Sequence, residues 1–417
     1  MKKNKALNML ILGSVVAVPM AAVAQNRIAI QIQQYQENDD RIDVQDGKLT
    51  LDHNFGTNHV VAMEYDWDSI SGASPSWDSV TGASQTVTSD AVTGASPCIN
   101  EDGDYYELCR DTREISGIVG DGFTGFDALK YGTTALTDLR NAGSFLYTYR
   151  TPKKRNEIST GLSYSEESDF KNTGASAEYL MYLDKNKNRS MTVGASFMKN
   201  EVYDYLDDHW NSFDLINTQI GVTQVFNANS VGKASIYFMS EDGHLSNPYF
   251  NVVRRINVTA EASDPAYFKF YLSRDSRPEK RQAGGLVTQY VNMASKGNTL
   301  HLSYRYYQDS WAVRSHTLEG KSFHDIGAKF RLGPVLRLYD QSAANFFKAN
   351  DAADNVFDES GFATADHRLG NYSSWTAQLG IEYKQTKDMI WNFTSGFQSQ
   401  STGLEFGWVN AGISYQY

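Results

Sequence analysis

The chain has 417 residues, a formal net charge of −11 at pH 7 and an aromatic content of 13%. An acidic chain without a run of lysine and arginine offers no electrostatic reason to bind nucleic acid. Beyond the N-terminal region, no window approaches the roughly eighteen consecutive apolar residues that a membrane helix needs, so a helical membrane protein is also excluded.

The N-terminal residues 1–24 predict a signal peptide. Three lysines among the first five residues precede the apolar stretch 9–18, and Ala22-Val23-Ala24 forms a small-residue cleavage site. We expect cleavage between Ala24 and Gln25, which removes three positive charges and moves the net charge from −11 to −14. An uncleaved N-terminal anchor is the alternative, and Pro19 together with the Ala-x-Ala pattern that follows argues against it.

After residue 25 the side chains alternate with a period of two. Residues 61–67 carry Val, Met, Tyr and Trp at odd positions and Ala, Glu and Asp at even positions, and similar alternation recurs at 300–307 and 389–398. Such runs predict strands with one face towards lipid and the other towards a polar interior. A soluble β-sandwich is the alternative.

The pattern predicts about sixteen strands, with fourteen to eighteen as the range. They are expected at 27–37, 41–54, 58–68, 138–150, 156–166, 172–184, 189–201, 214–227, 231–242, 282–294, 298–309, 313–322, 326–340, 368–384, 388–399 and 404–417. If the first strand runs outward, the short links fall on one side, at 55–57, 151–155, 185–188, 228–230, 295–297, 323–325 and 385–387. The long links fall on the other side, at 69–137, 202–213, 243–281 and 341–367.

This sorting of links predicts one all-β domain over residues 25–417, an antiparallel transmembrane β-barrel in the outer membrane with short periplasmic turns and long extracellular loops. The segment 69–137 is expected to be an extracellular loop or a plug inside the barrel. The terminal Tyr417 follows an alternating strand and resembles the signal of barrels that the barrel-assembly machinery inserts. That machinery and outer-membrane lipid are therefore expected partners.

Two cysteines, Cys98 and Cys109, lie in the segment 69–137. Because export would take them through an oxidising periplasm, we expect them to form a disulfide. A two-cysteine metal site is the alternative, but it lacks further Cys or His residues nearby. The sequence gives no indication of a bound metal or cofactor.

Several segments together resemble an uncharacterised family of predicted outer-membrane β-barrels that is catalogued as a domain of unknown function. They include Tyr35-Gln36-Glu37, Gly243-His-Leu-Ser-Asn-Pro-Tyr249, Asp275-Ser-Arg-Pro278 and Tyr339-Asp-Gln-Ser-Ala-Ala-Asn345. The resemblance covers nearly all of the mature chain, but residues 76–137 have no counterpart and look like an insertion. Genes of this family are often found near those for flavin transferases and small periplasmic redox proteins, so the resemblance implies periplasmic redox proteins as partners. It supplies no catalytic residues.

Charged residues are predicted to line the lumen on two sides. If the alternation is placed correctly, the acidic candidates come mainly from the early strands and the basic candidates from later ones. These candidates are Glu64, Asp66, Glu157, Glu178, Arg305, Lys329, Arg331 and Arg337. Opposed acidic and basic walls would create a transverse field that orients polar solutes and selects ions. The alternative is a set of salt bridges that only stiffens the barrel.

One short motif suggests catalysis. His244-Leu245-Ser246-Asn247 resembles the His-x-Ser-Asn signature of outer-membrane phospholipase, in which histidine activates serine. Pro248 replaces the glycine expected next, and Asn-Pro is also an ordinary turn. The favoured hypothesis is therefore a non-enzymatic channel or transport barrel for small polar or ionic solutes. A scaffold for a periplasmic electron-transfer or metal-linked system is the second hypothesis, and a surface lipid hydrolase the third.

Overall fold

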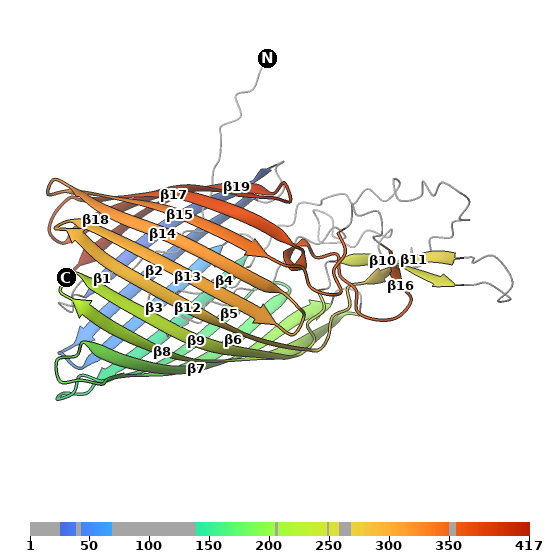
Figure 1. Cartoon of the computed structure of the whole chain (residues 1–417), viewed down its shortest axis with the longest axis horizontal. Coiled ribbons are helices and arrows are strands. Elements are labelled where there is room, and N and C mark those ends of the chain that lie inside the picture. The colour runs from blue at the N-terminus through green and yellow to red at the C-terminus, as the bar shows by residue number, and fades with distance from the viewer. Residues whose placement is uncertain are drawn as a thin grey trace, which may run out of the picture.

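Sixteen antiparallel strands close into a barrel, and a separate three-stranded sheet stands beyond one end of it (Figure 1). The computed structural model describes residues 26–38, 43–68, 139–204, 207–247, 250–257, 268–349 and 356–417. Within these ranges no helix is long and apolar enough to cross a membrane. The signal peptide with Ala24 and Gln25, and the segment 69–137 with Cys98 and Cys109, lie outside the described residues.

The barrel strands are each paired with both neighbours, and β1 pairs with β19 to close the ring. Closure leaves no strand edge open to pair with another chain. In ring order the strands are β1 (Arg27–Glu37), β2 (Asp43–Phe55), β3 (His59–Asp68), β4 (Arg140–Arg150), β5 (Glu157–Glu166), β6 (Phe170–Tyr182), β7 (Arg189–Asp204), β8 (His209–Asn227), β9 (Ser230–Gly243), β12 (Lys280–Ser295), β13 (Asn298–Asp309), β14 (Arg314–Ile326), β15 (Phe330–Gln341), β17 (Tyr372–Lys384), β18 (Met389–Gln400) and β19 (Glu405–Gln416).

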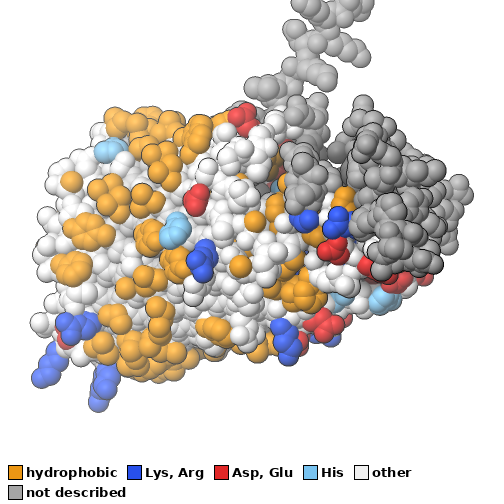
Figure 2. Space-filling view, turned by 45° about the vertical axis from the view of Figure 1, so that its right-hand side comes forward, with side chains coloured by type: hydrophobic (Ala, Val, Ile, Leu, Met, Phe, Trp, Pro, Cys, Tyr) orange, Lys and Arg blue, Asp and Glu red, His pale blue; other side chains and the backbone are white. Residues whose placement is uncertain are grey.

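The outer surface of the barrel is apolar because every second side chain points outward. On β1 these are Ile28, Ile30 and Ile32, which are 40%, 45% and 64% exposed, whereas Gln33 on the other face is buried. Hydrophobic side chains accordingly cover much of the outer wall (Figure 2). A lipid-facing apolar band around a polar interior is the arrangement of outer-membrane barrels.

The structure confirms the predicted fold class, a closed antiparallel barrel of sixteen strands. The C-terminus and the short turns lie at the end opposite the three-stranded sheet (Figure 1). We call the turn end periplasmic and the other end extracellular, following the usual orientation of such barrels.

Two predicted connections are wrong in position. The turn after β14 lies at residues 327–329 instead of 323–325, because Gly327 supplies the left-handed backbone (φ 64°) while His324 and Asp325 still pair with β15. The link expected at 202–213 spans only 205–208, because β7 and β8 continue their pairing as far as Asp204 and His209.

The long extracellular connections contain structure that the alternation did not predict. Strands β10 (Asn251–Asn257) and β16 (Val356–Asp358) pair in parallel, and β11 (Phe268–Arg274) pairs with the other edge of β10. A 3-10 turn at His367–Leu369 precedes β17, so this strand begins at Tyr372 and not at 368.

Candidate functional site: the charged lumen

The lumen wall is polar on the face that alternates with the apolar outer face. On β6 and β7, Asn172 and Asn200 are buried, and the Asn172 Nδ2 donates to the Asn200 Oδ1 at 2.6 Å. Across β4 and β5, the hydroxyls of Thr148 and Ser159 lie 2.8 Å apart. These small polar side chains leave the charged residues as the features that can distinguish one solute from another.

One cluster, which we call the acidic group, lies on β2 and β3 and consists of Asp46, Lys48, Glu64 and Asp66. The Lys48 Nζ lies 2.7 Å from the Glu64 Oε1 and 3.2 Å from the Asp66 Oδ1. These contacts follow from the strand register, in which Lys48 pairs with Asp66. Three carboxylates and one ammonium give this group a formal charge of −2.

A second cluster, which we call the basic group, lies on β13, β14 and β15 and consists of Arg305, Glu319, Lys321 and Arg337. The Glu319 Oε2 lies 2.6 Å from the Arg337 Nη2, and its Oε1 lies 2.9 Å from the Lys321 Nζ. Arg305 donates to the hydroxyl of Tyr237 at 3.2 Å, and its guanidinium lies over the Tyr237 and Tyr307 rings. Three cations and one carboxylate give this group a formal charge of +2.

The two groups face each other across the lumen. In the ring of sixteen strands, β13 is half-way round from β3, so Arg305 and Asp66 come from opposite walls. Salt bridges within each group neutralise part of the charge, but each keeps a net charge of two. Local ion pairs hold the side chains of both groups in place, and the formal net charges of the two groups are opposite.

The other lumen candidates occupy different places. Glu157 pairs with Arg150 at 2.9 Å, and Arg331 pairs with Asp325 at 2.6 Å, both at the periplasmic ends of their strands. Glu178 is on β6, where no described residue hydrogen-bonds its buried Oε2. The prediction that Lys329 lies in a strand and faces the lumen is wrong, because this residue lies exposed in the turn that Gly327 begins.

Sequence reasoning missed Asp46, Lys48, Glu319 and Lys321. Each of them lies on the inward face of its strand, as Glu319 does opposite Arg337. A count of all charged residues on the inward face of each strand would have found them. The aromatic partner Tyr307 lies two residues from Arg305 on the same face of β13, whereas Tyr237 lies 68 residues away and could not be found in this way.

Ser246 of the phospholipase-like motif has a structural hydrogen bond. Its hydroxyl accepts from the backbone N–H of Arg277 at 3.0 Å, and the neighbouring Asn247 N–H donates to Asp275 at 2.9 Å. In the parts of the chain that the structure describes, no hydrogen bond joins His244 to Ser246. The motif therefore shapes a loop here, and its residues do not form a serine–histidine pair.

The fold and its polar lumen define the class of protein, an outer-membrane β-barrel. A family model described as "Protein of unknown function (DUF3570)" matches residues 11–216 and 210–403, and the chain belongs to this family. No curated protein sequence matches the chain significantly.

Among solved structures, CdiB from Acinetobacter baumannii is similar with a TM-score of 0.51 at 7% identity, over 94% of this chain. The chain spans only 60% of the length of CdiB. A bacterial polysaccharide outer membrane secretin gives a TM-score of 0.46 at 7% identity, with 94% of this chain and 98% of that one covered. The CymD monoaromatic hydrocarbon channel gives 0.39 at 8% identity, with 94% and 88% covered. At these identities the likeness extends to the fold alone.

Proposed function

We propose that the protein is a non-enzymatic channel or transport barrel of the outer membrane that passes small polar or ionic solutes. The observation that carries this proposal is the pair of opposed charged groups inside the barrel. A barrel that served only as an anchor would gain nothing from opposite net charges on facing walls, whereas a channel uses them to orient and select solutes. The lumen path would pass between Asp66 on one side and Arg305 on the other.

The same proposal covers how the protein reaches its membrane. A signal peptide cleaved between Ala24 and Gln25 would direct export, and the barrel-assembly machinery would insert the folded strands. The apolar outer wall supports insertion, because its exposed residues match the lipid-facing band of an outer-membrane barrel.

Planar-bilayer recording of the purified full-length protein tests the proposed channel. We expect stepwise conductance increases as single barrels insert, together with a shift in apparent size on heating that shows the barrel was folded. Correctly folded protein that inserts without conductance at any voltage would overturn the proposal. A barrel that carries periplasmic redox proteins would then be the better hypothesis.

A further inference from the structure

Two long extracellular connections fold together into one packed body, which we call the cap. It consists of the described parts of residues 244–279 and 342–371, including β10, β11 and β16. One apolar core of the cap contains Val252, Phe357, Ala363 and Ala365, so it joins both connections. The cap stands beyond the barrel as the separate sheet of Figure 1.

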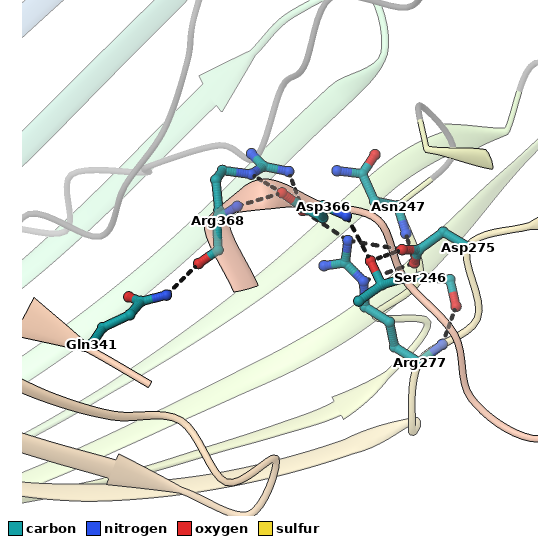
Figure 3. A network of polar contacts seen from close by, with 8 residues as sticks. Ser246, Asn247, Asp275, Arg277, Gln341, Asp366 and Arg368 are labelled. Carbon is teal, nitrogen blue, oxygen red and sulfur yellow. Dashed lines mark hydrogen bonds and ion pairs between the residues drawn. The ribbon is translucent and has the colours of Figure 1, made fainter. Parts of the chain in front are cut away.

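A buried ion-pair network centred on Arg277 joins the two connections (Figure 3). The Arg277 Nε lies 2.7 Å from the Asp275 Oδ1, and its Nη2 lies 2.8 Å from the Asp366 Oδ2, which is 89 residues away. The side chains of Arg277, Asp275 and Asp366 are only 7%, 0% and 1% exposed. The hydroxyl of Thr364 donates to Asp275, and Arg368 also pairs with Asp366, at 2.6 Å.

The network continues to the barrel rim. Gln341, the last residue of β15, donates to the backbone oxygens of Arg368 and Gly370 at 2.8 and 2.7 Å. A second apolar core packs Trp311 from the β13–β14 connection against Leu369. The cap is thus attached to the extracellular ends of the strands that carry the basic group.

This degree of burial is unlike that of ordinary surface loops. Taking an arginine and two carboxylates out of water is costly, and only close pairing and hydrogen bonding offset the cost. External loops that need no fixed shape keep their charges solvated. Removal of one partner would leave a charge buried without compensation, so the packing of the two connections against each other depends on Arg277, Asp275 and Asp366 together.

We propose that the cap is an extracellular gate over the basic side of the lumen and that Arg277 is the latch that holds it in one position. The proposal rests on the channel function proposed above. With the latch intact, the two connections move as one body, and solutes enter past it. With the latch open, the connections separate and solutes enter the lumen more easily.

The first test measures the latch without relying on conductance. Arg277→Met removes the charge that Asp275 and Asp366 share, and Lys280→Met is the matched control, because the Lys280–Asp242 pair is largely exposed. We expect hydrogen exchange in 244–247 and 356–369 to accelerate at least tenfold in Arg277→Met, with unchanged exchange in the barrel strands and in the control. Equal exchange in both variants would show that Arg277 is no latch.

The second test locks the gate. Ser276 and Ala363 exchange both backbone hydrogen bonds, at 2.9 and 2.8 Å, and residues so paired have Cα atoms about 5.5 Å apart, within disulfide range. In a background with Cys98 and Cys109 replaced by Ser, the Ser276→Cys/Ala363→Cys protein should hold one conductance level when oxidised. Reduction should restore switching between levels, and identical traces in both states would overturn the gate.

A third measurement separates failure of the gate from failure of the channel. In the same background, Ser303→Cys places a thiol on the lumen face of β13, next to the basic group. A membrane-impermeant maleimide added outside should label it several times faster when Arg277→Met is also present. Faster labelling without conductance would keep the gate and reject the channel. Unchanged labelling in a conducting barrel would keep the channel and reject the gate.

Discussion

The charge of the basic group should set the ion selectivity of the barrel. Arg305→Gln/Arg337→Gln lowers the formal charge of the group from +2 to zero, while Glu319 keeps its partner Lys321. A unit charge about 10 Å from an ion in water contributes about 0.4 kcal/mol. Removing two such charges disfavours an anion and favours a cation by about 0.8 kcal/mol each, a difference of about 1.6 kcal/mol. The ratio of anion to cation permeability should therefore shift about fifteenfold towards cations, since about 1.4 kcal/mol corresponds to a factor of ten.

The reversal potential across a salt gradient measures this shift. The effect should be near its full size in about 10 mM salt and almost vanish in about 1 M salt, where charges are screened within about 3 Å. Lys329→Gln is the matched control, because it removes one positive charge from the turn outside the lumen. A double variant that keeps the wild-type reversal potential, or a control that shifts it equally, would refute the reasoning.

Three further predictions concern stability and chemistry. A Cβ at Gly396 would lie 2.4 Å from the Trp408 ring, so Gly396→Ala should cost about 1–3 kcal/mol in urea unfolding, whereas Gly320→Ala, with 3.7 Å to its nearest neighbour, should not. Burial opposes ionisation of Asp366, but its arginine partners outweigh this and hold its pKa well below the usual range. A depressed pKa gives stability that is complete above the unfolded value of about 4 and is lost as pH falls further. The difference in cap hydrogen exchange between wild type and Asp366→Asn should thus stay constant from pH 8 to 5 and shrink below about pH 4. Ser246→Ala should leave phospholipid release at the background level, and release that the substitution abolishes would restore the hydrolase hypothesis.

Much of the barrel could be predicted because each strand carries its own signal. A period-two alternation of apolar and polar residues is local, so it marks a strand wherever one face meets lipid. The signal fails where the strands leave the apolar band. Residues 202–204 and 209–213 look like a loop by composition, yet they continue the β7–β8 ladder. The turn expected at residues 323–325 is in fact formed by residues 327–329, beginning at Gly327.

The lumen was partly predictable and the cap was not. Alternation predicted that the side chains of Glu64, Asp66 and Arg337 face the lumen. Their ion-pair partners depend on the register between neighbouring strands, which one sequence does not determine. The cap depends on contacts between distant segments. Arg277 and Asp366 are 89 residues apart, and neither lies in an alternating segment that would draw attention to it.

The most direct test of the lumen as the solute path compares two adjacent residues in the middle of β18. Thr394 is on the lumen face, in register with Gly380 and Asn410, while Ser395 is exposed on the lipid face beside Phe393. In a background without Cys98 and Cys109, a charged thiol reagent should reduce the conductance of Thr394→Cys and leave that of Ser395→Cys unchanged. Equal effects on both, or no effect on Thr394→Cys, would contradict a path through this lumen.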